Sequence, residues 1–184
     1  DVAPSRGLGD VYKRQELQGE QWIADVGFGG QTLTAPIRLQ ADVAQHTPHG
    51  EYRLIQEGED WILQFLHHEH WQSMYRFDLV MQHQSDYLMG NFWSAHWPQS
   101  HFRHHLLMCR HLPDGGKFTL TNFHFTHYQD GHAVEQINLP DVASLYALLQ
   151  ARFGLGVDDV KHGFTEEELA TVMAAFDTHP EAGK

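Results

Sequence analysis

The sequence predicts an α+β protein with short antiparallel strands in its first half, and with both strands and helices in its second half. From residue 17 to residue 79, short aromatic and aliphatic runs alternate with turns, a spacing typical of an antiparallel barrel or sandwich. Apolar residues recur at helical spacing in three later segments. With 184 residues, 41% of them hydrophobic, the chain can bury a core in one large domain or two small ones.

The first fifteen residues are not expected to belong to this fold. They lack an amphipathic period, and the run DVYKRQ at residues 10–15 resembles the translated transposase end sequence of sequencing-library adapters. The alternative is a flexible natural N-terminus. We therefore expect residues 1–15 to be an adapter-derived or artefactual tail, and the native chain to begin at about Glu16.

The stretch WIADVGFGG at residues 22–30 is the most informative part of the chain. Its strand-forming residues surround Asp25, and a carboxylate in apolar surroundings is costly unless it is hydrogen-bonded or paired. The glycines that follow permit unusual backbone conformations and a close approach of a ligand. This setting suits an aspartate that orients a catalytic histidine. The alternative is a strand that ends in a turn, with Asp25 bonding the loop amides.

The remaining strands of the first half follow at short intervals. The pattern predicts a hairpin in which residues 52–55 and 61–66 are joined by the EGED sequence at 57–60, a loop of about four residues. Residues 71–79 supply another strand.

The second half begins with a helix. Ser85 or Asp86 can cap it, and Pro98 stops it. The pattern then predicts a three-strand meander over residues 105–111, 117–125 and 133–139.

Two further helices follow the meander. The first covers residues 142–149, with Gly154 as its C-terminal stop. The second begins with a capping box formed by Thr165 and Glu168. Its expected buried stripe consists of four apolar residues at helical spacing: Leu169, Val172, Met173 and Phe176.

Charge and cysteine content exclude several classes of function. The formal net charge of −12 argues against a nucleic-acid or anionic-membrane surface, although partial protonation of 16 His residues would offset some of it. No apolar run reaches membrane-spanning length, and no signal peptide is recognisable. The single Cys109 rules out an intrachain disulfide framework, so we expect a cytoplasmic protein. The sequence leaves a homodimer open.

Asp25 and its glycine loop resemble the aspartate motif of the arylamine N-acetyltransferases. The similarity covers residues 16–184 and is greatest to the bacterial N-hydroxyarylamine O-acetyltransferase branch. The motif alone is moderately specific, but further segments in register make the resemblance strong. These segments are PIRL at 36–39, GEYRL at 50–54, YRF at 75–77 and SHF at 100–102.

The resemblance implies a helical bundle, a β-barrel and an α/β lid, of which this chain would supply the last two. It implies ping-pong transfer of acetyl from acetyl-coenzyme A (acetyl-CoA) to an aromatic amine, or to the oxygen of a hydroxylated one. We therefore expect a C-terminal fragment with four parts: a tail at 1–15, a β-barrel domain at 16–84, a helical connector at 85–104 and a lid at 105–184.

The resemblance also assigns roles to six residues. Asp25 is the catalytic carboxylate of a Cys-His-Asp triad, and Phe28 and Phe102 line the substrate pocket. Gly27, Gly29 and Gly30 would bring backbone N–H groups close to the acyl or pantetheine end of coenzyme A; the alternative is that a tight turn alone requires them. The family's His lies about fifteen residues before the Asp, near Asp10, and its Cys lies further upstream in an Arg-Gly-Gly-x-Cys motif that is not in this sequence. The fragment alone is therefore predicted to be inactive.

Cys109 is not expected to replace the family's nucleophile. It lies in a buried-strand pattern, LLMCR, and follows Asp25 in the chain instead of preceding it. Free Cys is among the most buried residue types, and its sequence neighbour Arg110 is the one group nearby to depress its pKa. We interpret Cys109 as an inert core thiol.

Histidine clusters provide an alternative function. The sequence HHEH at 67–70, and two later groups at 101–105 and 124–132, are consistent with a zinc site, because zinc takes three or four such ligands. None of them forms an HExxH or a Cys/His finger pattern. We therefore expect no functional metal, and keep a His-rich zinc protein or a non-catalytic β-barrel binding module as alternatives.

Overall fold

The structure is a computed structural model that describes residues 12–25, 27–155 and 163–177. The chain divides into two compact units, Asp1–Phe92 and Trp93–Lys184. The division falls inside helix α1, Gln84–His96, which is the helix predicted before Pro98. The two units are therefore described one at a time.

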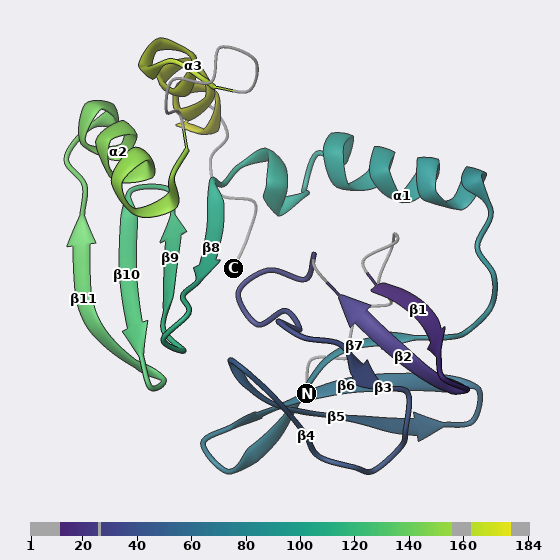
Figure 1. The fold of residues 1–184 in the computed structure, drawn as a ribbon. Coiled ribbons are helices and arrows are strands. Elements are labelled where there is room, and N and C mark those ends of the chain that lie inside the picture. The colour runs from purple at the N-terminus through teal and green to yellow at the C-terminus, as the bar shows by residue number, and fades with distance from the viewer. Residues whose placement is uncertain (1–11, 26, 156–162, 178–184) are drawn as a thin grey trace. The chain divides into compact units, whose positions relative to one another are not determined.

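The first unit contains two antiparallel sheets (Figure 1). The three-stranded sheet has the order β1-β2-β3, and the four-stranded sheet follows chain order from β4 to β7. The strands are β1 Tyr12–Leu17, β2 Glu20–Asp25, β3 Ile37–Arg38, β4 Gln45–Thr47, β5 Gly50–Glu57, β6 Asp60–His67 and β7 His70–Phe77. The predicted α+β class with antiparallel sheets is confirmed.

Strand β1 corrects one expectation. Residues 12–15 were predicted to lie outside the fold, yet they form the first part of β1 and pair with β2, with Tyr12 opposite Asp25. The prediction was wrong here because a β-ladder is built from main-chain N–H and C=O groups, which every non-proline residue carries. The adapter origin of residues 1–15 stays a prediction.

One apolar core holds the first unit together. Its residues come from β2, β3, β5, β6 and β7, and Leu33 is added from the loop between β2 and β3, so both sheets contribute side chains. The buried residues are Ile23, Leu33, Ile37, Tyr52, Leu54, Trp61, Leu63, Tyr75 and Phe77.

Two turns of this unit are tighter than the sequence suggested. The predicted four-residue loop is a two-residue turn, because Glu57 already pairs with Asp60. The HHEH segment is also a turn: His67 pairs with His70, while His68 and Glu69 have φ angles of 45° and 66°. Two successive positive φ angles are typical of a type I′ hairpin, so these histidines do not share a regular strand face.

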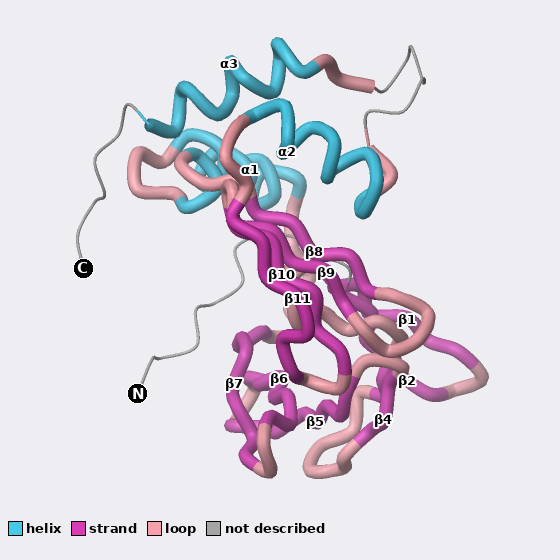
Figure 2. Tube along the Cα trace, turned by 90° about the vertical axis from the view of Figure 1, so that its left-hand side faces the viewer, coloured by secondary structure: helices cyan, strands magenta, loops and turns pink. Residues whose placement is uncertain are grey.

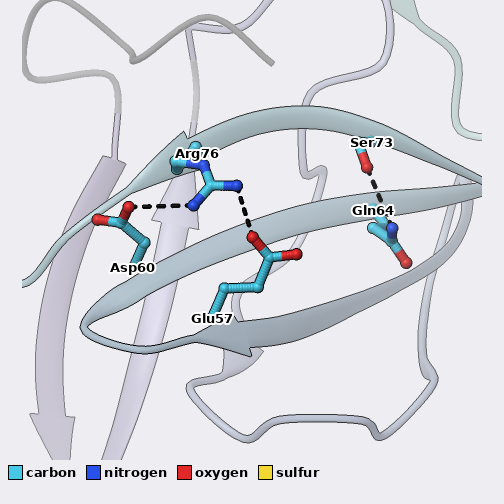
Figure 3. A network of polar contacts seen from close by, with 5 residues as sticks. All are labelled: Glu57, Asp60, Gln64, Ser73 and Arg76. Atoms are coloured by element: carbon cyan, nitrogen blue, oxygen red, sulfur yellow. Dashed lines mark hydrogen bonds and ion pairs between the residues drawn. The ribbon is translucent and has the colours of Figure 1, made fainter. Parts of the chain in front are cut away.

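Polar side chains reinforce the four-stranded sheet (Figure 3). Arg76 donates to Glu57 Oε2 at 2.6 Å and to Asp60 Oδ2 at 3.0 Å, which ties β7 to the β5–β6 turn. These two hydrogen bonds raise the pKa of the Arg76 guanidinium. Gln64 on β6 donates to Ser73 Oγ on β7 at 3.1 Å. These contacts tie β7 to β6 and to the β5–β6 turn at two separate places along the strands.

Gly50 starts β5 at a position that only glycine tolerates well. Its φ is +144°, and a Cβ built there would lie 2.5 Å from Cε2 of Phe65. We expect Gly50→Ala to destabilise the chain by about 1–3 kcal/mol, measured by the urea midpoint. Gly58→Ala is the matched control, since Gly58 also has a positive φ, +65°, but has nothing within 4 Å of an added Cβ. Equal losses for both variants would contradict the steric explanation.

The second unit is a four-stranded antiparallel meander with helices packed on it (Figure 2). Its strands are β8 Leu107–His111, β9 Lys117–Thr121, β10 His124–Gln129 and β11 His132–Asn138. The single strand predicted at 117–125 is wrong, because Asn122 adopts a φ of 52° and turns the chain between β9 and β10. Asparagine is one of the few residues that readily takes this conformation.

The helices of this unit lie where the pattern predicted them, but the predicted buried stripe of the last helix is wrong at Val172, which is 46% exposed. Helix α2, Val142–Leu148, continues into a π-helical turn, Leu149–Phe153, and ends at Gly154. Helix α3, Glu166–Asp177, packs beside α2 (Figure 2). The buried core combines both helices with the sheet: Phe118, Leu120, Phe125, Leu145, Leu148, Leu149, Leu169 and Met173. A short 3₁₀ turn, His101–Arg103, precedes β8.

The predicted capping box at α3 is confirmed. The Glu168 amide donates to Thr165 Oγ1 at 3.2 Å, and the Thr165 amide donates back to Glu168 Oε2 at 2.8 Å. The hydrogen bonds from Thr165 hold the pKa of Glu168 below its usual value. Within the described ranges, none of these helices has the length and apolar character needed to cross a membrane.

Candidate active site

Strand β2 delivers Asp25 to the end of a ladder. The second half of the strand alternates between half-buried and buried residues, so Ile23 and Asp25 both point into the first unit. Asp25 is only 1% exposed, and its backbone lies opposite residue 12 of β1. The predicted carboxylate is therefore buried at the last pair of the β1–β2 ladder.

The two oxygens of Asp25 have different surroundings. Oδ1 accepts a hydrogen bond of 2.9 Å from the Gly27 amide. Oδ2 is also buried, but finds no donor among the residues that the structure describes. A buried carboxylate oxygen without a donor is unfavourable, so this atom has the properties expected of an acceptor for a further group. The alternative, in which Asp25 only bonds the amides of its own turn, thus accounts for Oδ1. It does not account for the burial of Oδ2.

Thr32 closes the loop that follows Asp25. Its amide donates to the carbonyl oxygen of Gly29 at 3.1 Å, and its hydroxyl donates to the carbonyl oxygen of Asp25 at 3.0 Å. Gly29 has a φ of +99°, which a side chain would disfavour. The loop is therefore a closed turn that brings its end back to the aspartate.

Phe28 is the aromatic residue of this loop. Its ring packs against Tyr75 of β7, with the ring centroids 5.0 Å apart and the planes tilted by 42°. The side chain nevertheless stays 39% exposed. One part of the ring is thus supported by the core of the first unit, and another part is open to a planar ligand.

Phe102, the other predicted pocket residue, belongs to the second unit. It lies in the 3₁₀ turn His101–Arg103 and is 71% exposed. Phe28 and Phe102 are thus on different units, and a shared pocket stays a prediction.

The predicted coenzyme-binding glycines differ in their backbone contacts. The Gly27 N–H is committed to Asp25 Oδ1, and the Gly29 carbonyl accepts from Thr32. Gly27 and Gly29 are both exposed, whereas Gly30 is half-buried. The role of the three glycines in coenzyme binding stays a prediction.

Tyr52 is a residue of the site region that the sequence reasoning did not single out. Its hydroxyl lies 3.1 Å from the carbonyl oxygens of both Gln31 and Thr32, so it contacts the end of the Asp25 loop from β5. The GEYRL segment contains Tyr52, but a contact spanning 20 residues leaves no local pattern in the sequence.

Cys109 lies on β8 of the second unit and is partly buried. Burial raises the pKa of its thiol, and the nearby Lys117 opposes this shift only in part. Its sulfur is 3.8 Å from Nε2 of His111, which lies two residues further along the same strand face. The predicted neighbour of the thiol was Arg110; the contact with His111 was not predicted, although the i, i+2 spacing on a strand indicates it.

The histidines do not gather into a metal site in the part of the chain that the structure describes. There, no three His, Cys, Asp or Glu side chains are arranged to hold a metal ion. This arrangement gives no support to the zinc alternative.

Sequence comparisons find close relatives. Residues 12–162 match the model of a family described as N-acetyltransferase. The chain is 83% identical over 169 residues to the arylamine N-acetyltransferase of Escherichia coli. It is 82% identical over 169 residues to the arylamine N-acetyltransferase / N-hydroxyarylamine O-acetyltransferase of Salmonella typhimurium. Each match covers 92% of this chain and 60% of the relative, so the chain spans about three-fifths of their length.

Solved structures show the same similarity. The arylamine N-acetyltransferase from Salmonella typhimurium superposes with a TM-score of 0.84 at 79% identity, over 90% of this chain and 60% of that one. The arylamine N-acetyltransferase of Mycobacterium marinum in complex with CoA gives a TM-score of 0.81 at 29% identity, over 93% and 62%.

Proposed function

Because the chain belongs to the arylamine N-acetyltransferase family, we propose that it forms the Asp25-bearing part of an acetyl-CoA-dependent acetyltransferase. The complete enzyme transfers acetyl to an aromatic amine, or to the oxygen of a hydroxylated one. The observation that carries this proposal is the buried Oδ2 of Asp25, which has no donor among the described residues. An imidazole N–H is the donor that a Cys-His-Asp triad would supply there.

The proposed reaction has two steps. The triad histidine takes the proton of the cysteine thiol, and the thiolate attacks the acetyl carbonyl of acetyl-CoA, which releases coenzyme A as its thiol. The amine or hydroxyl oxygen of the acceptor then attacks the thioester, loses a proton to the histidine, and restores the cysteine. Asp25 holds the imidazole in the productive tautomer and stabilises the imidazolium. The resemblance assigns the cysteine and the histidine to positions outside residues 16–184.

The β1–β2 register supports the role of Asp25. Residue 12 lies opposite Asp25, and positions two apart on a strand face the same side of a sheet. The family's histidine falls at about position 10, which is outside the described residues. The β1–β2 ladder thus brings the backbone of the neighbouring strand next to Asp25, and the resemblance assigns the histidine of the complete enzyme to that neighbouring strand.

We assign the substrate contacts to Phe28, Phe102 and the glycine loop. The exposed part of the Phe28 ring offers a face to the arylamine, with Tyr75 supporting it from behind. Phe102 contributes a second aromatic face. Gly27, Gly29 and Gly30 let the acyl end of coenzyme A approach the backbone, and the Gly27 N–H remains with Asp25. In this proposal the first unit is the β-barrel domain and the second is the lid.

The proposal is tested with a chimera in which residues 16–184 replace the matching segment of the Salmonella typhimurium relative. We expect the purified chimera to acetylate an arylamine with acetyl-CoA, measured by product formation under saturating donor. A chimera that folds cooperatively but transfers no acetyl would contradict the proposal. Zinc bound stoichiometrically to the untagged 184-residue chain would instead favour the metal-binding alternative.

Phe28→Ala in this chimera is expected to raise the KM for the arylamine by about 3- to 10-fold. This factor corresponds to the loss of one aromatic contact worth about 0.5–1.5 kcal/mol. Phe28→Tyr keeps the ring face and should leave the KM within about twofold, which makes it the matched control. An unchanged KM for Phe28→Ala would remove Phe28 from the acceptor pocket.

A further inference from the structure

One tyrosine holds the end of the loop that starts at Asp25. Tyr52 lies on β5, is 1% exposed, and points its hydroxyl at the carbonyl oxygens of Gln31 and Thr32, both 3.1 Å away. A phenol has a single proton, so the two carbonyls share it in a three-centre hydrogen bond. Two adjacent peptide units of the loop thus depend on one donor.

Thr32 connects this donor to the aspartate. Its carbonyl accepts from Tyr52, and its hydroxyl donates to the backbone carbonyl of Asp25 at 3.0 Å. The Asp25 side chain is in turn fixed by the Gly27 amide through Oδ1. The direction of the remaining oxygen, Oδ2, therefore depends on the shape of a loop whose far end is held by Tyr52.

The hydroxyl of Tyr52 is a permanent donor in this environment. Burial, together with the negative charge of Asp25, raises the pKa of Tyr52 to about 12. A phenolate would also face two carbonyl oxygens and repel them. The hydroxyl thus stays protonated at every pH at which a Cys-His pair can transfer acyl groups.

We propose that Tyr52 is a positioning residue for acetyl transfer, which acts through Thr32 to aim Asp25 Oδ2 at the triad histidine. The inference rests on the proposed function, since it specifies how the aspartate of that triad is held. It concerns the orientation of Asp25, so it predicts a loss in kcat rather than in substrate affinity.

The kinetic test uses the chimera with substitutions that remove single hydroxyls. Tyr52→Phe and Thr32→Val are each expected to lower kcat by about tenfold, with the KM for acetyl-CoA within about twofold. Thr32→Ser keeps the hydroxyl and should restore most of kcat. Both hydroxyls act along one chain of contacts. The kcat of the Tyr52→Phe, Thr32→Val double variant should therefore fall no further than that of the more impaired single variant.

The matched control is Tyr146→Phe. The Tyr146 hydroxyl also donates to a backbone carbonyl, that of Phe164 at 3.2 Å, but in the second unit. The kcat of the Tyr146→Phe chimera should stay within about twofold of that of the unsubstituted chimera. If Tyr52 had a purely structural role, Tyr52→Phe would lower the yield or the melting temperature of the chimera. The kcat per folded enzyme of that variant would then stay unchanged.

A second experiment measures hydrogen exchange and does not depend on catalysis. In the 184-residue chain, Tyr52→Phe should speed hydrogen exchange of the Thr32 amide, which donates to Gly29 at 3.1 Å, by about tenfold or more. Tyr146→Phe should not change it.

Unchanged exchange, an unchanged kcat for Tyr52→Phe, or losses that multiply in the double variant would each overturn the inference and leave the proposed function intact. An inactive unsubstituted chimera would overturn the proposed function, and the role of Tyr52 in acetyl transfer with it.

Discussion

Asp25→Asn in the chimera is expected to lower kcat by about 10³- to 10⁴-fold while the fold is retained. An asparagine fills the same space, and its carbonyl oxygen can still accept from the Gly27 amide. The group at the position of Oδ2 then becomes an amide, which donates instead of accepting. The imidazole N–H would meet a donor, and the productive tautomer would be lost. The measurement is kcat for arylamine acetylation, alongside circular dichroism and thermal melting.

Asp114→Asn provides a matched control for this substitution. Asp114 also accepts from the amide two residues ahead, with Gly116 N at 3.1 Å from Oδ1, but it lies exposed in the turn before β9. Its variant should keep kcat within about twofold. Similar losses for both variants, or a loss of less than about tenfold for Asp25→Asn, would contradict the role of Asp25 in the triad.

The 184-residue chain alone is expected to give no acetyl transfer above the uncatalysed rate. Its single thiol, Cys109, has a pKa raised by burial, so little reactive thiolate forms at neutral pH. The neighbouring His111 is 3.8 Å from the sulfur, at the outer limit for a hydrogen bond to sulfur. The measurement is turnover of acetyl-CoA with an aniline, together with mass spectrometry of the chain for an acetylated Cys109.

Cys109→Ser in the chimera tests whether Cys109 takes part in acetyl transfer by the complete enzyme. We expect kcat within about twofold of the unsubstituted chimera, because burial keeps the Cys109 thiol protonated and the proposed reaction gives it no role. The assignment of Cys109 as inert would be refuted if the 184-residue chain acetylated an arylamine and if Cys109→Ser abolished that activity.

The local features of the fold were well predicted from the sequence. Periodicity and capping chemistry act over a few residues, so α1, α2 and the Thr165–Glu168 box could be recognised directly. The predicted cap of α1 was wrong, because the helix already begins at Gln84 and both Ser85 and Asp86 lie inside it. Turns were harder to place. Asn122 breaks the predicted strand with a left-handed conformation that asparagine tolerates but does not require, and the apolar pattern continues on both sides of it.

For the candidate site, the sequence could predict the burial of Asp25 but not the difference between its two oxygens. Apolar neighbours on both sides indicate burial, whereas the partner of each oxygen depends on the exact path of the loop. The contribution of Tyr52 was out of reach for a similar reason. Its partners Gln31 and Thr32 come together with it only when β5 packs beneath the loop.

The shielded phenol of Tyr52 makes the protein sensitive to alkali. Between pH 10.0, the ordinary value for tyrosine, and about 12, the folded chain retains this proton while the unfolded chain releases it. Rising pH in that window therefore favours unfolding, and the stability contributed by the hydroxyl is kept only at lower pH. In an ultraviolet titration, the Tyr52 phenol of the folded chain should ionise only at a pH of about 12. A late step in the absorbance difference spectrum would thus report, without any label, that the glycine loop has opened.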